Sequence, residues 1–257
     1  MFDSHCHLDD PTLVAELPRW LDEGASLGIT GWFVPGVSRE RQAGLRGLNA
    51  QHPELCFGAG IHPWYVDELG DQLLSALRDA AEQRGDAVAI GECGLDSGHA
   101  KRAGHGMERQ VLAFESQLAL SCDLQLPVVL HIVGAHGAAL KILRRFGPFP
   151  QGGVLHAYSG SAELVGDYEA LGLSFGVGGL ITRSGARRAL AAVLEMSSDR
   201  LLLETDAPDM SPEGVPPGHN TPLTLPQVAQ KLAELRGETL QIIDDVTTAN
   251  ARRLYSV

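Results

Sequence analysis

The strongest constraint on the fold is an alternation that runs along the whole chain. Short apolar or β-branched runs, which end near Gly, His, Asp or Pro, are followed by longer stretches with apolar residues at helical three- and four-residue spacing. The eight runs are residues 2–8, 29–34, 55–61, 87–92, 128–132, 153–157, 173–177 and 201–205. The 257 residues divided among eight units give about 32 residues per unit, close to one βα repeat.

The stretches between these runs complete the predicted topology. Helices are expected at residues 11–27, 67–83, 107–124 and 183–196. The apolar runs at 88–90 and 201–203 suit parallel strands that are buried on both faces. Irregular stretches at 96–106 and 210–226 follow strands, where the loops of a barrel build the active site. A doubly wound open sheet is the competing fold, but no Gly-rich phosphate loop follows an early strand. We therefore predict an α/β protein with one (β/α)8 TIM-type barrel domain over residues 1–257.

Composition narrows the class of protein. Hydrophobic residues make up 44% of the chain, which excludes intrinsic disorder. No apolar run approaches the ~20 residues of a membrane span, and the start of the sequence lacks the features of a signal peptide. The four cysteines lie far apart without a Cys-x-x-Cys pair, so we expect reduced thiols in a cytoplasmic protein. A net charge of −12 disfavours a broad nucleic-acid surface, and any such contact is expected to be local.

Ionisable residues recur at the predicted strand ends. His5 and His7 are two residues apart on the first strand, so both face one side while Cys6 faces the other. The other strand-end residues are Glu92 on the fourth strand, His131 on the fifth, His156 on the sixth, and Glu204 and Asp206 on the eighth. Each residue alone is more simply explained as a loop carboxylate or a hydrogen-bonded core histidine.

Together these residues indicate a metal centre. In a barrel, the carboxyl ends of all strands meet at one mouth. Grouping so many ionisable side chains without a cation would cost several kcal/mol for each buried charge. The expected ligands are His5, His7, Glu92, His131, His156 and Asp206. Six ligands are too many for one tetrahedral ion, but they suit two ions that share a carboxylate.

Seven motifs in this order resemble the TatD-related deoxyribonucleases, metal-dependent hydrolases with an amidohydrolase-like barrel. They are residues 3–9 (DSHCHLD), 60–63 (GIHP), 89–96 (AIGECGLD), 126–131 (LPVVLH), 156–161 (HAYSGS), 203–208 (LETDAP) and 250–255 (NARRLY). The resemblance spans nearly the whole chain. Each motif alone is moderately specific, and the ordered set is highly specific.

The resemblance implies a role for each site residue. His5, His7 and Asp206 would hold one ion, His131 and His156 the second, and Glu92 would bridge them. His62 is similar to the substrate-facing histidine of the family, although a loop histidine before Pro63 is the simpler reading. Glu204 would lie near the ligand histidines and help to orient them without binding metal itself. We count it with Asp206 and His62 among the catalytic residues.

Three departures from the family pattern concern substrate contacts. Ser97-Gly98-His99 stands where the family often has two aromatic residues after Gly-Leu-Asp. Val133 stands where an arginine often follows the fifth-strand histidine. His219-Asn220-Thr221-Pro222 replaces the usual Arg-Asn-Glu-Pro. No expected metal ligand is lost, so these departures alter the expected substrate contacts and leave the expected metal site unchanged.

The expected reaction is hydrolysis of DNA phosphodiester bonds by metal-activated water, with Asp206 as general base. One alternative is a hydrolase of small amides, lactones or phosphoesters; the carboxylated lysine of many such enzymes is replaced here by Glu92. The other alternative is a barrel that binds metal but does not catalyse. Four histidine ligands favour Zn, Mn, Fe or Ni over Mg, whereas the resemblance points to Mg. The sequence does not fix the oligomeric state, and a monomer is compatible with it.

Overall fold

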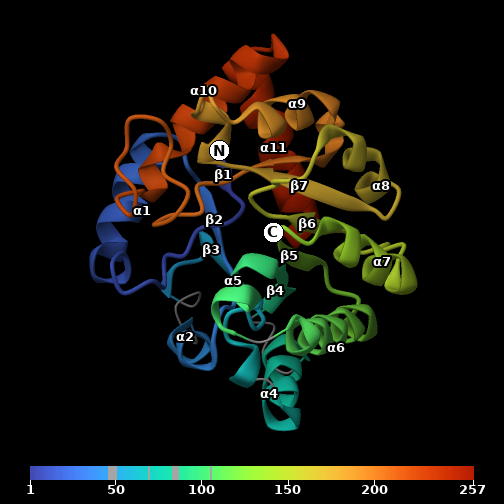
Figure 1. Ribbon diagram of the computed structural model, residues 1–257. Coiled ribbons are helices and arrows are strands. Elements are labelled where there is room, and N and C mark those ends of the chain that lie inside the picture. The colour runs from blue at the N-terminus through green and yellow to red at the C-terminus, as the bar shows by residue number, and fades with distance from the viewer. Residues whose placement is uncertain (46–50, 69, 83–86, 105) are drawn as a thin grey trace. The chain divides into compact units, whose positions relative to one another are not determined.

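The fold is that of a (β/α)8 barrel, as predicted. The computed structural model describes residues 1–45, 51–68, 70–82, 87–104 and 106–257 (Figure 1). Its eight strands succeed one another in the sheet in chain order, and the pairs of known register are parallel. The strands are β1 (Phe2–Asp3), β2 (Gly31–Val34), β3 (Leu55–Ala59), β4 (Ala87–Asp96), β5 (Val128–Val133), β6 (Gly153–Leu155), β7 (Leu173–Val177) and β8 (Leu201–Leu203).

At least one α-helix separates each strand from the next. The helices are α1 (Leu17–Ser26), α2 (Arg39–Leu45), α4 (Asp71–Glu82), α5 (Ser97–Arg102), α6 (Glu108–Leu124), α7 (His136–Phe146), α8 (Val165–Glu169), α9 (Arg187–Glu195), α10 (Leu225–Arg236) and α11 (Leu240–Tyr255). Short 3-10 turns are η1 (Val14–Glu16), η2 (Val66–Glu68), η3 (Ala162–Leu164), η4 (Gly179–Thr182), η5 (Ser198–Arg200) and η6 (Pro222–Thr224).

The chain divides into two compact units. The first unit comprises Met1–Val34, His156–Gly166 and Ser174–Val257, and the second comprises Pro35–Leu155 and Asp167–Leu173. A single domain over residues 1–257 stays a prediction. No disulfide joins the four cysteines, all of which lie in the described ranges. Among the described residues, no helix is long and apolar enough to cross a membrane.

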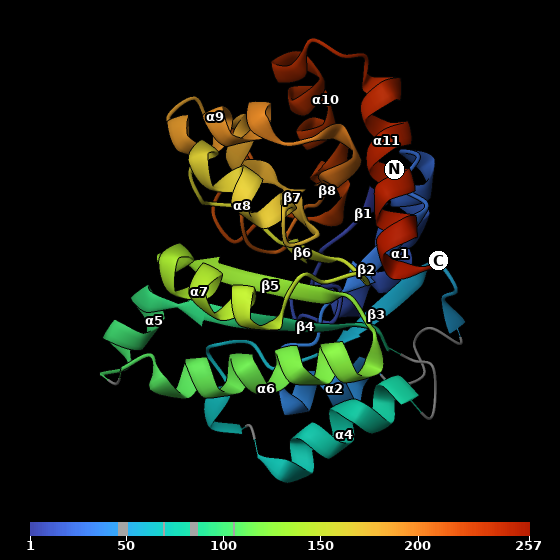
Figure 2. The same cartoon turned by 90° about the vertical axis from the view of Figure 1, so that its right-hand side faces the viewer.

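In the first unit, α11 closes the core over β1 and β8. Figures 1 and 2 show α10 and α11 side by side at the C-terminal end of the chain. Tyr255 at the end of α11 stacks on Phe33 with ring centroids 4.2 Å apart, and its hydroxyl donates to the Ser4 carbonyl at 3.0 Å. Asn250 donates from Nδ2 to the carbonyls of Ser198 and Leu201. The last helix therefore fixes the residues that flank β1 and β8.

In the second unit, α4 and α6 cover β3 and β4 (Figure 2). An apolar cluster fills this interface, and it includes Ala59, Ile61, Leu73, Leu77, Ala87, Ile90 and Leu120. Two buried glutamines on α6 satisfy main-chain groups at the end of β4 and just after β3. Gln117 accepts from the Ile61 amide at 2.7 Å and donates to its carbonyl at 3.0 Å. Gln110 does the same for Asp96, at 2.8 and 3.2 Å.

All eight predicted strands are present, with shifted ends. β7 has the predicted bounds. Five strands are shorter than predicted, namely β1, β2, β3, β6 and β8, whereas β4 and β5 extend further, to Asp96 and Val133. The prediction that His5 and His7 lie on a strand is wrong, because the His5 amide bonds to the Asp3 carboxylate instead of extending the ladder. Glu92 lies within β4 and not at its end.

The helix predictions differ mainly at the ends. α6 and α9 lie within the predicted 107–124 and 183–196. The predicted 11–27 contains η1 and α1. The predicted 67–83 contains the end of η2 and all of α4, and its residues Leu69 and Gln83 lie outside the described residues. The stretch 96–106 is not wholly irregular, because Asp96 caps α5 by accepting from the His99 amide; His105 lies outside the described residues. The stretch 210–226 contains η6 and the start of α10.

Candidate metal centre

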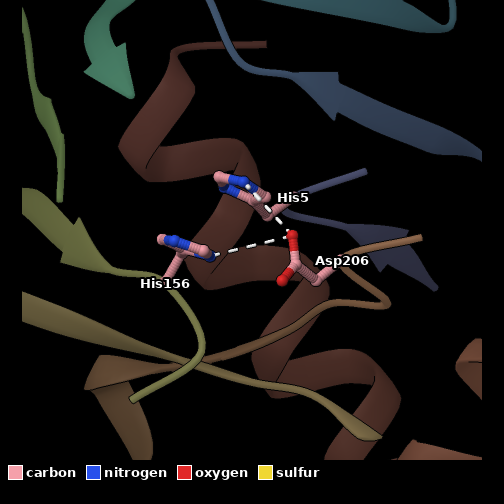
Figure 3. Close-up of side chains that lie close together, drawn as sticks. All are labelled: His5, His156 and Asp206. Atoms are coloured by element: carbon pink, nitrogen blue, oxygen red, sulfur yellow. Dashed lines mark ion pairs between the residues drawn. The ribbon is translucent and has the colours of Figure 1, made fainter. Parts of the chain in front are cut away.

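Three histidines of the first unit surround one carboxylate. His5 and His7 follow β1, and His156 and Asp206 follow β6 and β8. Oδ1 of Asp206 lies 3.7 Å from His5 Nε2, 3.4 Å from His7 Nε2 and 3.9 Å from His156 Nδ1. Figure 3 shows His5 and His156 directed toward Asp206, and their rings stack with centroids 4.0 Å apart. We call these four residues the Asp206 cluster.

Main-chain hydrogen bonds hold the Asp206 cluster together. The Asp206 amide donates to the His5 carbonyl at 2.9 Å, and the His7 amide donates to the Ala207 carbonyl at 2.9 Å. Asp206 has a left-handed backbone with φ of 53°, which aspartate tolerates better than most residues. The segment that follows β1 and the segment that follows β8, from opposite ends of the sequence, are thus hydrogen-bonded to each other.

Glu204 lies buried behind the Asp206 cluster. Its Oε1 accepts from the Ala157 amide at 2.5 Å and lies 3.9 Å from His156 Nδ1. Gly176 on β7 makes room for it, because a Cβ at that position would collide with Oε2 of Glu204. Burial raises the pKa of Glu204 to about 8; the neighbouring His156 opposes this shift and the charge of Asp206 adds to it.

Asp206 shows the opposite shift. Burial alone would raise the pKa of Asp206, but the hydrogen bond to His7 and the nearby His156 and His5 lower it. The carboxyl groups of Glu204 and Asp206 are only two residues apart in sequence, yet Asp206 is the one suited to carry a negative charge at neutral pH. A charged carboxylate is also the form that binds a cation.

In the second unit, Glu92 forms the centre of another group. Its Oε1 lies 2.9 Å from His131 Nδ1 on β5 and 3.5 Å from His62 Nε2, just after β3. Glu92 is 1% exposed, so this carboxylate depends on nearby donors or a cation for its charge. Asp96 at the end of β4 lies 3.8 Å from His131 Nε2. We call Glu92, His131, His62 and Asp96 the Glu92 cluster.

His62 differs from the other histidines in how its ring is held. Its Nδ1 accepts the Trp64 amide at 3.1 Å. In a neutral imidazole, the other nitrogen then carries the hydrogen. Nε2 of His62 is therefore a donor toward Glu92 or toward a substrate oxygen, which fits the substrate-facing role better than metal ligation.

The donor atoms in both clusters suit a divalent transition metal. Ligand atoms of His5, His156 and Asp206 lie within 4.8 Å of one another, as do those of His62, Glu92 and His131. Imidazole nitrogens combined with carboxylate oxygens are the donor set of Zn and Mn sites. The residues present therefore fit divalent metal ions.

Sequence reasoning missed Asp96 and its neighbour Trp64. The Trp64 indole donates from Nε1 to Asp96 Oδ2 at 2.8 Å. Burial opposes ionisation of Asp96, but hydrogen bonds with His131, Trp64 and the His99 amide lower its pKa. The sequence feature that could have identified Asp96 is its spacing from Glu92. Asp96 stands four residues after Glu92, and residues at even spacing on an extended strand point to the same face of the sheet.

The three departures from the family pattern have separate structural positions. His99 stacks on Trp64 with centroids 5.4 Å apart. Val133 is 42% exposed at the end of β5. Asn220 is buried, and its Nδ2 donates to the carbonyls of Thr205 and Asp209, so it fixes the loop after β8.

The family of this chain follows from its similarity to known proteins. The model of the family described as TatD related DNase matches residues 2–256. This chain belongs to that family. The TatD relatives include a protein named 3'-5' ssDNA/RNA exonuclease TatD from Erwinia tasmaniensis, which is 34% identical over 263 residues and is covered completely, as is this chain. The uncharacterized metal-dependent hydrolase YjjV of Escherichia coli K12 is 33% identical, with 99% of this chain and 97% of YjjV covered.

Solved TatD structures agree with the fold. The crystal structure of YjjV, a TatD homologue from Escherichia coli K12, superposes with a TM-score of 0.92 over 100% of this chain and 98% of that chain, at 33% identity. A TatD family hydrolase from Entamoeba histolytica, at 17% identity, has a TM-score of 0.86 over 99% of this chain and 97% of that chain. The protein is a TatD-family metal-dependent hydrolase with a TIM-barrel fold.

Proposed function

We propose that the protein is a divalent-metal-dependent phosphodiesterase that degrades single-stranded DNA or RNA from an end. The observation that carries the proposal is the convergence of three imidazoles on the buried Asp206 carboxylate, within the motif order of the TatD family. Relatives that share about a third of the residues over their full length are named as 3'-5' ssDNA/RNA exonucleases.

The roles of the individual residues are part of this proposal. His5, His7 and Asp206 hold one ion, and the distances of both imidazoles from Asp206 support that set. Glu92 bridges to a second ion held by His131 and His156. The short Glu92–His131 distance supports the pairing of these two, and the place of His156 follows from the family resemblance and the barrel strand ends.

The chain's own groups then perform the remaining chemistry. When bound, the divalent ions supply water activation and stabilise the charge that develops on the phosphoryl group. Asp206 accepts the proton of the attacking water, since its lowered pKa keeps it ionised. His62 donates from Nε2 to a phosphoryl oxygen, and Glu204 fixes His156 and the Ala157 amide from behind.

The net charge of the chain favours contact with only a few nucleotides of the substrate. A net charge of −12 opposes binding along a long duplex, because phosphate contacts need many cations. A strand end that offers one or two nucleotides to the ions avoids this repulsion. We include a cytoplasmic location in the proposal, since none of the four cysteines forms a disulfide.

One assay separates the proposed function from its alternatives. The purified protein would be stripped with a chelator and reloaded with Zn, Mn or Mg. It would then be given end-labelled single-stranded DNA, single-stranded RNA, duplex DNA and end-blocked DNA, beside a panel of small phosphoesters, lactones and amides. We expect stepwise shortening of unblocked single strands and no shortening by stripped protein. Hydrolysis of small phosphoesters, lactones or amides without any activity on strands would favour the small-molecule hydrolase. Metal binding without turnover of any substrate would favour the inactive scaffold.

A further inference from the structure

Two large aromatic side chains, Trp64 and Tyr65, follow His62 of the Glu92 cluster after one intervening proline. Trp64 is 48% exposed and Tyr65 is 38% exposed, although each lies within three residues of the buried His62. The other two tryptophans, Trp20 and Trp32, are 6% and 1% exposed. A single exposed apolar side chain is ordinary in soluble proteins, so the exposure of Trp64 needs support from its surroundings.

The surroundings of Trp64 hold its ring in one orientation. The indole N–H is anchored on Asp96 at 2.8 Å. The His99 ring lies at 17° to the indole plane with centroids 5.4 Å apart, and the His62 ring meets it edge-on at 5.0 Å. Nearly half of the side chain remains open to solvent even so. An aromatic surface that is fixed before binding loses little conformational entropy when a flat ligand stacks on it.

The segment that carries His99 is locally basic in an acidic protein. Lys101 and Arg102 are exposed on α5, and the sequence from Ser97 to Met107 contains no acidic residue. Two carboxylates that follow Trp64 in sequence are already engaged, since Asp67 pairs with Arg109 and Glu68 accepts the Arg39 amide at 2.8 Å. Lys101 and Arg102, on the helix that also carries His99, are therefore the cations available to a phosphate backbone.

The Trp64 indole also lies close to residues of the proposed active site. The His62 ring contacts the Trp64 ring on one side and the His131 ring on the other, with centroids 5.0 and 4.3 Å apart. A group stacked on Trp64 thus lies close to His62 of the Glu92 cluster. Stacking on an aromatic side chain binds any base, because every base has a π-face.

We propose that Trp64, steadied by Asp96 and flanked by His99, is a stacking platform for a nucleobase of the single strand whose phosphodiester bond is cleaved. This inference rests on the proposed function and adds the residue that grips the base. It implies that a base is required next to the cleaved bond, without preference among the four bases.

The test compares substrates with and without bases. The metal-loaded protein would be assayed on a single-stranded oligothymidylate and on an abasic phosphodiester oligomer of equal length and charge. We expect the wild type to show a lower KM on oligothymidylate, and Trp64→Ala to raise that KM about 5- to 150-fold, the range that stacking of one base gives. Activity of Trp64→Ala on the abasic oligomer should match the wild type, and Trp64→Phe should retain most of the base preference.

The matched control is Leu194→Ala, which truncates a 55% exposed apolar residue on α9 and should leave both KM values unchanged. An equal loss on both substrates in Trp64→Ala would overturn the proposal, because the indole would then act through Asp96 and His131. Unchanged kinetics on oligothymidylate would overturn it as well and would leave the phosphodiesterase function intact.

Tryptophan fluorescence tests the platform independently of turnover. Trp64 is the exposed one of the three tryptophans, so oligothymidylate added to chelator-treated protein should quench the emission saturably. This quenching should vanish in Trp64→Ala and be absent with the abasic oligomer. Quenching without hydrolysis by the loaded enzyme would support the platform and contradict the proposed function, whereas absence of quenching would overturn the platform whatever the enzyme hydrolyses.

Discussion

The Thr205 hydroxyl donates a 2.6 Å hydrogen bond to Oδ2 of Asp3, across 202 positions of sequence. The Thr205 amide donates to Oδ1 of the same carboxylate at 3.0 Å. Asp3 is the last residue of β1 and is completely buried, and burial raises its pKa to about 7 although these hydrogen bonds lower it. Thr205 stands between Glu204 and Asp206, so this contact sets the segment that carries both carboxylates.

Thr205→Val should therefore destabilise the protein and loosen its metal. Valine keeps the shape but removes one donor from a buried carboxylate, which costs about 1–3 kcal/mol. Urea unfolding would give the free-energy change, and a chelator competition would give the metal affinity. Thr248→Val is the control, because it removes a 2.9 Å hydroxyl bond to Asp244 within α11 and should leave metal affinity alone. Equal effects of the two variants would contradict the linking role of Thr205.

The second prediction concerns Glu92. If its carboxylate bridges two ions, Glu92→Gln keeps the size of the side chain but removes a negative charge between two cations. Bound metal per chain should fall, and hydrolysis of single strands should decrease by several orders of magnitude. Elemental analysis and steady-state kinetics would measure both quantities. Wild-type metal content with wild-type rates in Glu92→Gln would exclude the bridging role.

The third prediction separates the residues of the first motif. His5→Ala and His7→Ala should each weaken the binding of one ion, since both imidazoles lie within 4 Å of Asp206. Cys6 between them is 0% exposed, and burial raises the pKa of its thiol well above the ordinary value. Cys6→Ser should thus change metal content little. A Cys6→Ser protein that folds but contains no metal would refute the assignment of the two histidines.

The sequence was sufficient for the fold and for histidines that lie beside Asp206 and Glu92, but not for where the strands end. Three strands stop where buried carboxylates take over main-chain donors. The His5 amide turns to Asp3 after β1, the Thr205 amide to Asp3 after β8, and the Ala157 amide to Glu204 after β6. The bonds after β8 and β6 join residues 202 and 47 positions apart, so no local pattern could reveal them.

Asp96 and Trp64 escaped prediction for related reasons. The segment Cys93-Gly94-Leu95-Asp96 lacks the β-branched residues typical of a strand, yet it pairs with β5 from Leu130 to Val133. A loop was therefore expected where β4 continues. The role of Trp64 depends on its bond to Asp96, 32 positions away, which only the folded chain brings about.

The last prediction distinguishes chemistry from substrate grip. Asp206 is surrounded by three histidines of the first unit, whereas His62 offers an Nε2 hydrogen because its Nδ1 accepts the Trp64 amide. Asp206→Asn should abolish turnover and reduce bound metal, since an amide neither accepts a proton from water nor supplies the charge that a cation needs. His62→Ala removes one donor to a substrate oxygen and should keep the full metal content, with kcat/KM lowered about 10- to 1000-fold.

Metal analysis decides between the two roles of His62. The ligand atoms of His62, Glu92 and His131 are close enough to share an ion, so the geometry of the cluster alone permits ligation. The tautomer argues otherwise, because a protonated Nε2 cannot bind a metal. His62→Gln provides the matched variant, since its amide still carries a donor and should recover part of the rate lost in His62→Ala. Loss of metal in His62→Ala to the level of Asp206→Asn would instead make His62 a ligand and remove it from the substrate contacts.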